Sequence, residues 1–554
     1  MDPIIRICSA VGIALAFSPP AAQAKRDTPS ALSAYVQGRM ADASGQEAQA
    51  VAAYEVALSA DPASLPVAIR AYRQAVEGGN KALALRAART LDAQKALPPD
   101  GLLLLISESF AKADWPGAEL QIDRMEEAGT FSFLTPVLRA WLTLGAGRGD
   151  PLGPLSVRSG DGLSSTYAQE HRGILLLATK QIEGGVSAVG AVRAAGLGDN
   201  RTLQLRLSAA QRLVDLGDRA SALKLLSGDD RLMTLAREQV AAGKAVANSV
   251  TRPATGMAML LARVSNDLIR DNASPVSVTL ARLATFADPS FVPASLVLAR
   301  ALGGVNDADG AIAALALTRP NAVSAALAEE LRFDLMITGE RFAEALVLAK
   351  ARADAPSATA YDAARVGEIL AKMERPAEAA TAYARAIDLM AGPNKDQPVP
   401  WNLWLLLGRE HDLAKDWAQA KPALMRAVEL GPDEPSALNH LGYSMLVNGE
   451  SLTEATRLIE KASGLRPGDA AIADSLGLAL LKAGQVEKAI PILARAAQNE
   501  PAIAEIGEHL GDAYWAAGRR VDARYAWGAA LVQSDGDDAK RIAGKIDLGP
   551  KQSD

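Results

Sequence analysis

The sequence has little of the chemistry that metalloenzymes and disulfide-bonded proteins use. It contains one cysteine, Cys8, in 554 residues, so no intramolecular disulfide can form. Its four histidines (171, 411, 440 and 509) are never four residues apart, which excludes the helical His-Glu-x-x-His zinc motif. No Gly-x-Ser-x-Gly string and no Gly-x-x-x-x-Gly-Lys-Ser/Thr phosphate loop occurs. We therefore expect no catalytic residue, no cofactor and no metal site.

Aromatic residues and excess positive charge are also scarce. Phe, Trp and Tyr make up 4% of the chain, which together with abundant alanine argues against an all-β protein and favours close-packed helices. The 58 basic and 64 acidic side chains give a net charge of -6. Because nucleic-acid binding needs a basic surface, nucleic acid is not an expected partner.

The first 24 residues have the pattern of a secretory signal peptide. Arg6 precedes an apolar run over residues 7–17, and a small-x-small cleavage site, Ala22-Gln23-Ala24, follows two prolines. Cys8 stands at the start of this run, so most of the apolar stretch follows it, which argues against a lipid anchor. No later stretch is long and apolar enough to span a membrane. We expect a periplasmic protein of a Gram-negative bacterium that starts at Lys25; the alternative is a cytoplasmic protein with an uncleaved apolar end.

A repeat of about 34 residues organises the chain. Gly408, Gly442, Gly477 and Gly511 each stand at position 8 of a unit and are 34, 35 and 34 residues apart. Small residues recur at positions 20 and 27, bulky ones at 24, and proline near 32. Small residues let two antiparallel helices approach closely, and proline ends the second helix. The pattern predicts helical hairpins that must stack to bury their apolar faces.

These units resemble the tetratricopeptide repeat family. The resemblance implies an all-α solenoid, a right-handed superhelix of antiparallel hairpins. After the signal peptide it predicts N-terminal hairpins over 25–143, a Gly/Pro/Ser-rich linker or loop over 144–165 and degenerate repeats over 166–359. Well-formed repeats follow over 360–533, and a capping helix with a tail over 534–554. Ala391–Pro400 is an insertion between two units.

A narrower resemblance rests on the C-terminal strings Leu441-Gly442-Tyr443-Ser444 and His509-Leu510-Gly511-Asp512-Ala513-Tyr514-Trp515. They look like the end of a proteobacterial family of exported multi-repeat proteins. Some of its members are lipoprotein adaptors for a carboxy-terminal processing protease. That resemblance implies a non-catalytic adaptor that recruits a protease or cell-wall enzymes, although this chain lacks a usable lipid-anchor cysteine.

In the tetratricopeptide family, positions 2, 5, 9, 12 and 13 of the first helix of each hairpin line a concave groove. Carried over to this sequence, those positions give candidate peptide-binding residues, with Tyr443 and Trp515 as possible aromatic anchors. The candidates are Asn402, Arg409, Asp412, Asn439, Tyr443, Asp474, Lys482, Glu508, Asp512 and Trp515.

Other interpretations stay open beside the groove. The ten candidates could be ordinary solvated helix residues, and an enzyme with an unrecognised site is the third class of function. His440 and His509 share position 6 of their units, which indicates either a pH-sensitive pair or, as we favour, common descent of neighbouring repeats. Expected partners are other proteins or peptides; the oligomeric state is not predicted.

Overall fold

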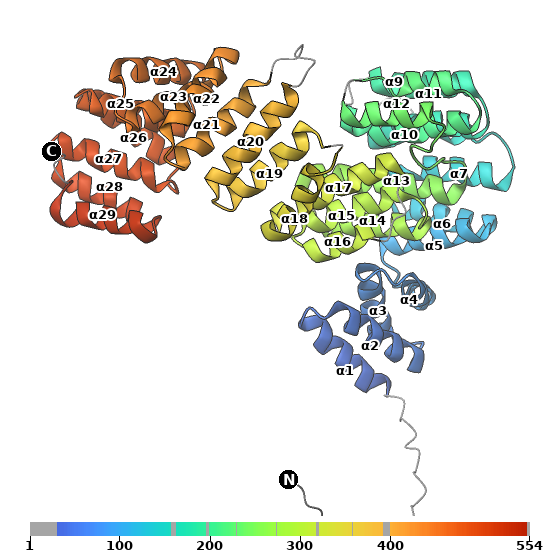
Figure 1. Ribbon diagram of the computed structural model, residues 1–554. Coiled ribbons are helices and arrows are strands. Elements are labelled where there is room, and N and C mark those ends of the chain that lie inside the picture. The colour runs from blue at the N-terminus through green and yellow to red at the C-terminus, as the bar shows by residue number, and fades with distance from the viewer. Residues whose placement is uncertain are drawn as a thin grey trace, which may run out of the picture. The chain divides into compact units, whose positions relative to one another are not determined.

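The computed structural model describes residues 30–156, 162–194, 199–228, 230–272, 274–316, 321–356, 358–391 and 399–550. These residues form 29 α-helices and two short 3₁₀ helices, with no strand among them, which confirms the all-α prediction for this part of the chain. The chain divides into two compact units, Met1–Leu335 (unit 1) and Met336–Asp554 (unit 2) (Figure 1). The predicted leader, Cys8 and residues 392–398 of the insertion lie outside the described residues.

Unit 1 is a succession of helices that pair with their neighbours in the chain. Each of α1, α3, α5 and α8 packs against the helix that follows it, as expected of hairpins. The helices are α1 (Ala31–Ala43), α2 (Glu47–Ala60), α3 (Leu65–Glu77), α4 (Lys81–Ala93), α5 (Pro99–Lys112), α6 (Trp115–Ala128), η1 (Ser132–Leu134), α7 (Thr135–Ala146), η2 (Gly153–Leu155), α8 (Leu163–Ala178), α9 (Ile182–Ala194), α10 (Asp199–Asp215), α11 (Arg219–Leu225), α12 (Arg231–Ala241), α13 (Pro253–Asn272), α14 (Pro275–Ala287), α15 (Val292–Gly304), α16 (Ala308–Ala316) and α17 (Ala322–Thr338), the last of which crosses the boundary.

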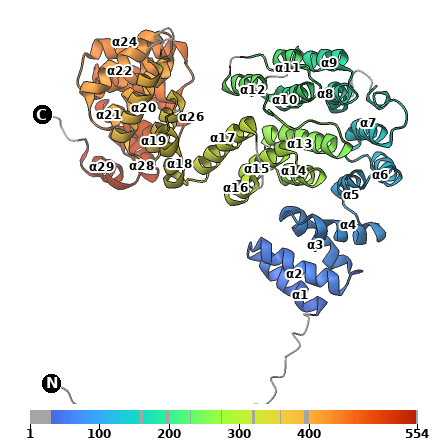
Figure 2. The same ribbon diagram turned by 45° about the vertical axis from the view of Figure 1, so that its right-hand side comes forward.

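In unit 1 the chain also folds back on itself. Helix α13 packs against α5 and α7, and α14 packs against α3 and α5 (Figures 1 and 2). Lys81 Nζ donates a hydrogen bond to the carbonyl of Phe286 at 2.6 Å, and Arg282 Nη2 donates one to the carbonyl of Glu77 at 2.8 Å. A repeat array that contacts only successive units has no such contacts between residues 205 positions apart, so the 34-residue spacing did not predict them.

A buried charge network fixes the returning helix α13. Arg263 Nε lies 3.0 Å from Glu170 Oε2, and its Nη1 lies 2.5 Å from Asp267 Oδ1. Tyr167 donates a hydrogen bond to Asp267 at 3.0 Å. The side chains of Arg263 and Glu170 are 8% and 3% exposed, so neither charge is solvated and each depends on the other.

Unit 2 is a more regular array in which each hairpin packs against the next one. Its helices are α18 (Phe342–Ala353), α19 (Ala360–Lys372), α20 (Pro376–Met390), α21 (Trp401–Leu413), α22 (Trp417–Leu430), α23 (Pro435–Val447), α24 (Leu452–Leu465), α25 (Ala470–Lys482), α26 (Val486–Asn499), α27 (Ala504–Ala516), α28 (Arg520–Val532) and α29 (Gly536–Leu548).

The glycine at position 8 explains how the two helices of each hairpin approach. A Cβ atom built on Gly511 would lie 2.3 Å from Trp527, and one built on Gly477 would lie 2.4 Å from Leu493. Trp527 and Leu493 occupy position 24 of the same units and are fully buried. Glycine is thus required here by contact with the bulky residue of the partner helix, as the repeat pattern predicted. Helix α22 ends at Leu430, two residues before Pro432.

The predicted linker or loop and the predicted C-terminal capping segment each bury an apolar side chain in a core. The stretch 144–165 includes the end of α7, the turn η2 and the start of α8, and Leu155 of η2 is buried in the unit 1 core. In the C-terminal segment, α29 buries Ile542 against Trp527 and Ala530. None of the described helices has both the length and the apolar character needed to cross a bilayer.

Candidate functional site

The candidate site is the face of unit 2 formed by the first helix of each hairpin, which we call the groove face. The predicted residues come from four of these helices: three from α21, two from α23, two from α25 and three from α27. Asn402 and Lys482 are exposed, Asp474 and Glu508 are buried, and the other six are half-buried. The ten residues are therefore not equally available to a ligand.

Two adjacent recesses hollow the groove face at its α19–α23 end. The larger one, the α19–α21 recess, has a volume of about 660 Å³. It combines two tyrosines and two leucines with cationic and acidic side chains. Its lining consists of Tyr361, Ala364, Arg365, Glu368, Ala371, Lys372, Tyr383, Leu406, Arg409, Glu410 and Leu413.

The smaller one, the α21–α23 recess, has a volume of about 260 Å³ and shares Leu406 and Arg409 with the first. Two of its side chains have buried polar atoms without a hydrogen-bond partner, Oδ1 of Asn439 and Nε2 of His440. Burial lowers the pKa of His440, which favours the neutral imidazole. The recess is lined by Leu405, Leu406, Arg409, Ser436, Asn439, His440, Asp469, Ala471 and Ile472.

Some acidic side chains of the groove face already have hydrogen-bond or ion-pair partners within the chain. Asp412 of α21 accepts hydrogen bonds from Ser444 Oγ at 2.5 Å and from Asn448 Nδ2 at 3.4 Å; Ser444 lies on α23 and Asn448 follows directly after that helix. Arg409 pairs with the buried carboxylate of Glu410, its neighbour in sequence, at 2.7 Å. The contacts of Asp412 connect successive hairpins, so this residue already has a structural role.

The final helix, α29, covers the predicted groove residues of α27. Glu508 accepts hydrogen bonds from Arg541 at 2.6 and 3.0 Å, and Lys545 Nζ lies 2.7 Å from Glu508 Oε1. Asp512 accepts a hydrogen bond from the same lysine at 2.6 Å. These contacts lower the pKa of Glu508, although its burial acts in the opposite direction. The C-terminal end of the groove face is thus occupied by the chain's own basic side chains.

Trp515, proposed as an anchor, is also packed within the chain. Its ring centroid lies 5.4 Å from that of Trp527, and the guanidinium of Arg520 lies 4.6 Å from the centroid of the Trp515 ring. Gly549, just after α29, is so close that a Cβ there would lie 2.4 Å from the indole. The structure thus gives Trp515 a packing role at the end of the array.

Between the open recesses and the covered end lies a cluster that joins α23, α25 and α27. His509 Nδ1 lies 2.9 and 3.0 Å from the two carboxylate oxygens of Asp474, and Tyr443 donates a hydrogen bond to Glu505. Burial disfavours the charged form of His509, but the hydrogen bond to Asp474 and the charges of the nearby carboxylates outweigh it and raise the pKa of His509. Burial and the bond to Glu505 raise the pKa of Tyr443.

The sequence reasoning missed the residues of α19 that line the larger recess. Tyr361, Glu368 and Lys372 stand at positions 2, 9 and 13 of the unit marked by Gly367. The position rule applied from residue 402 onward would have selected them if it had been started one unit earlier. It could not have shown that α29 covers the last unit, because that depends on tertiary contacts.

Comparison with known proteins agrees with the repeat geometry. The chain is 34% identical over 118 residues to a TPR repeat-containing protein of Pseudomonas aeruginosa. The paired helices of the chain have the tetratricopeptide repeat fold. The match spans 21% of this chain and about a fifth (20%) of the relative's length. No protein-family model matches the chain.

Several solved tetratricopeptide and related structures align with parts of this protein. A thermophilic TPR protein of Thermus thermophilus is 23% identical and covers 34% of this chain and 100% of its own, with a TM-score of 0.30. PilW, a type IV pilus biogenesis factor, is 18% identical and covers 35% of this chain and 87% of its own, with a TM-score of 0.30. MamA is 23% identical and covers 30% and 94%, with a TM-score of 0.25.

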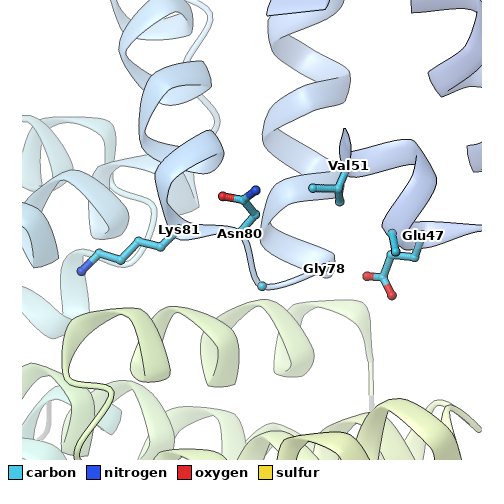
Figure 3. A pocket seen from close by; sticks show the side chains of 7 residues that line it. Glu47, Val51, Gly78, Asn80 and Lys81 are labelled. Carbon is cyan, nitrogen blue, oxygen red and sulfur yellow. The ribbon is translucent and has the colours of Figure 1, made fainter. Parts of the chain in front are cut away.

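Unit 1 has a hollow of its own. It has a volume of about 520 Å³ and lies beside the turn between α3 and α4 (Figure 3). Glu47 and Lys81 lie at its opposite ends, and Lys81 is bonded to the carbonyl of Phe286. A side chain at Gly79 would lie 3.2 Å from Arg282. Because Lys81, which lines it, is hydrogen-bonded to α14, this hollow belongs to the contact that closes unit 1.

Proposed function

We propose that this protein is a non-catalytic scaffold that binds an extended peptide segment of another protein along the α19–α23 part of its groove face. This part has two connected recesses, whereas the α27 end is covered by α29. A segment crossing both recesses would pass Arg409, which lines each of them. Arg409 would therefore offer the peptide a polar contact between the two recesses.

The observation that carries this proposal is the pair of unpartnered polar atoms in the α21–α23 recess. Buried polar groups almost always have a hydrogen-bond partner, and one without a partner costs roughly 1–3 kcal/mol. Asn439 Oδ1 and His440 Nε2 are two such atoms in one recess. Once the Asn439 and His440 side chains turn into the recess, the N–H and C=O groups of an extended peptide can satisfy both atoms, because an amide oxygen accepts and a neutral imidazole nitrogen donates or accepts.

The chemistry of the larger recess defines the ligand further. Tyr361, Leu406 and Leu413 supply apolar surface, which suits one aromatic or aliphatic side chain of the peptide. Lys372 and Arg409 supply positive charge beside it. We infer that the preferred segment carries an apolar anchor followed by an acidic or amide-rich stretch.

The location and the partner extend the proposal. The pattern of residues 1–24 supports export to the periplasm, and the narrower resemblance supports recruitment of a protease or of cell-wall enzymes in the envelope. A cytoplasmic scaffold and an enzyme with an unrecognised site are the alternatives. Mass spectrometry of the mature N-terminus tests the first alternative, since a chain that starts at Lys25 supports export.

Cross-linking in cells, followed by purification of the complexes, tests the binding face. The variants Arg409→Glu and Asn439→Ala should remove the cross-linked partners, because both residues line the α21–α23 recess. Lys482→Ala is the matched control, since Lys482 is exposed on α25 and lines neither recess. Unchanged partners in both recess variants would show that another face binds. Hydrolase assays of the purified protein test the enzymatic alternative.

A further inference from the structure

The cluster between α25 and α27 contains three different side chains that can ligate a metal. Asp474, Glu505 and His509 each offer one ligand atom, and these atoms all lie within 4.8 Å of one another. Among the described residues this is the only group of at least three such side chains that meets that condition. The sequence alone did not reveal this group of ligands, because Asp474 and His509 are 35 residues apart and belong to different hairpins.

The distances within the cluster suit a small divalent ion. With metal–ligand bonds of about 2.1 Å, neighbouring ligand atoms are about 3.0 Å apart in an octahedron and about 3.4 Å apart in a tetrahedron. His509 Nδ1 lies 2.9 and 3.0 Å from the Asp474 oxygens. An ion would take the place of the proton that the imidazole now shares with this carboxylate, with a small rotation of the ring to direct its lone pair at the ion.

The net negative charge of the cluster favours a cation at this point. Asp474 is 5% exposed, and the oxygens of its carboxylate both face the same imidazole nitrogen. Glu505 brings a second carboxylate to the cluster. Two carboxylates around one imidazole have excess negative charge, and a divalent cation balances it better than a single proton does.

From this juxtaposition we propose that Asp474, Glu505 and His509 form a binding site for a divalent transition-metal ion of the Zn²⁺ type. The imidazole selects such an ion over Ca²⁺ and Mg²⁺, which prefer all-oxygen sites. Water completes the coordination, since three protein ligands leave a position open. The proposal needs no bound peptide and is independent of the proposed function.

Tyr443 has the place of an outer-shell partner for this ion. Its hydroxyl, on α23, donates a hydrogen bond to Glu505. Outer-shell donors of this kind orient a ligating carboxylate and tune the affinity of the site. The ion would therefore connect α25 and α27 directly and α23 through Tyr443. It would fix the relative positions of three successive hairpins on the groove face.

The repeat itself supplies an internal comparison. His440 occupies position 6 of its unit, as His509 does in the unit two hairpins later. Position 5 of the preceding unit holds Asp474 in the case of His509 but Leu405 in the case of His440. Position 2 of the histidine's own unit holds Glu505 beside His509 but Ser436 beside His440. The histidine is thus shared by the two units, and the carboxylates make the difference between an ordinary position and a metal site.

Isothermal titration of the full chain with Zn²⁺ tests the proposal. The protein should carry Cys8→Ser and no histidine tag, so that no other strong ligand interferes. We expect one saturable site per chain, unaffected by millimolar Mg²⁺ and Ca²⁺. His509→Gln and Asp474→Asn should weaken Zn²⁺ binding by about 100-fold or more, and Tyr443→Phe by about 10-fold. His440→Gln, the matched control, should leave the affinity unchanged.

Two further measurements keep the test decisive. Co²⁺ bound at the site should give visible d–d absorption that His509→Gln abolishes. Far-UV circular dichroism checks that each variant is folded; if His509→Gln is not, Glu505→Gln replaces it, because Glu505 is exposed and its loss should weaken binding by about 10-fold. The proposal is overturned if Zn²⁺ binds the ligand variants as tightly as the parent, or if no saturable site exists at micromolar Zn²⁺.

Discussion

The two units of this protein use the same helical hairpins but differ in what holds the hairpins together. In unit 2, polar contacts join hairpins one or two units apart, as between Asp412 and Ser444, which are 32 residues apart, and between Tyr443 and Glu505, which are 62 apart. In unit 1, additional polar contacts join residues 93 to 205 positions apart, such as Arg263 with Glu170 and Lys81 with Phe286. Unit 2 is thus an array of neighbours, and unit 1 is an array closed by a returning pair of helices.

This difference in contacts indicates a different role for each unit. An array of neighbours leaves the face of its first helices open, and in unit 2 that face carries the two recesses. The returning helices α13 and α14 instead cover helices of unit 1 that an open array would expose. We expect unit 2 to bind ligands and unit 1 to unfold as a cooperative body, because its contacts are long-range.

The largest effect should come from breaking the charge network that closes unit 1. Arg263→Met removes the cation that lies 3.0 Å from the buried carboxylate of Glu170, and loss of one partner of a buried pair typically costs about 3–5 kcal/mol. Urea unfolding monitored by hydrogen–deuterium exchange should show a large shift of the unit 1 transition to lower urea. Peptides of unit 2 should keep their protection.

Two variants sharpen that result. Adding Glu170→Leu to Arg263→Met should recover part of the lost stability, because that acidic charge is then no longer buried. Arg86→Met removes an exposed pair with Glu55 in the same unit and should leave the transition nearly unchanged. A shift as large as that of Arg263→Met in this control would mean that burial does not distinguish the two pairs.

The second prediction is a pH dependence of stability that distinguishes unit 1 from unit 2. Burial, with the nearby charge of Arg263, lowers the pKa of His171 in unit 1 to about 3, and Trp141 Nε1 lies 3.0 Å from its Nδ1. Below about pH 6.5, the ordinary pKa of histidine, the unfolded chain takes up a proton at His171 that the folded chain does not. The free energy of unfolding therefore decreases as the pH is lowered. Between pH 6.5 and 5 this amounts to about 2 kcal/mol for unit 1.

A variant without this imidazole gives the comparison. His171→Asn should be less stable than the parent at pH 7, because it leaves space beside Trp141, but it should lose about 2 kcal/mol less between pH 6.5 and 5. Urea midpoints across that range, resolved by unit with hydrogen exchange, measure the difference. Parallel pH profiles for parent and variant would rule out a buried neutral His171 as the cause.

How much could be predicted differs between the units for a physical reason. In unit 2 the contacts that define the fold are local, so Gly477 and Leu493 appear in the sequence at a fixed spacing of 16 residues. The hairpins and their close approach followed from that spacing. In unit 1, neither Arg263 nor Glu170 belongs to a spacing rule, and the return of α13 could not be inferred from one sequence.

The candidate site was predictable only as a set of positions. The position rule identified Arg409 and Asn439, which line the recesses, but also Glu508, which α29 covers. Whether a groove position is open depends on the side chain that the next helix places against it. Arg541 of α29 is such a side chain, and nothing in the repeat pattern marked it as one.

The smallest effect tests whether the contacts of unit 2 are as local as its sequence pattern indicates. Gly511→Ala places a Cβ atom 2.3 Å from the fully buried indole of Trp527, and overpacking of this kind costs about 1–3 kcal/mol, of which the higher helix propensity of alanine offsets up to about 1. Gly528→Ala, in the partner helix α28, meets no atom within 4 Å and should stabilise the protein by about 0.5–1 kcal/mol. The urea midpoint of the unit 2 transition should therefore move in opposite directions for the two variants. If both stabilise the protein, position 8 is glycine for a reason other than contact with position 24, and the comparison between a locally encoded unit and a long-range one loses its basis.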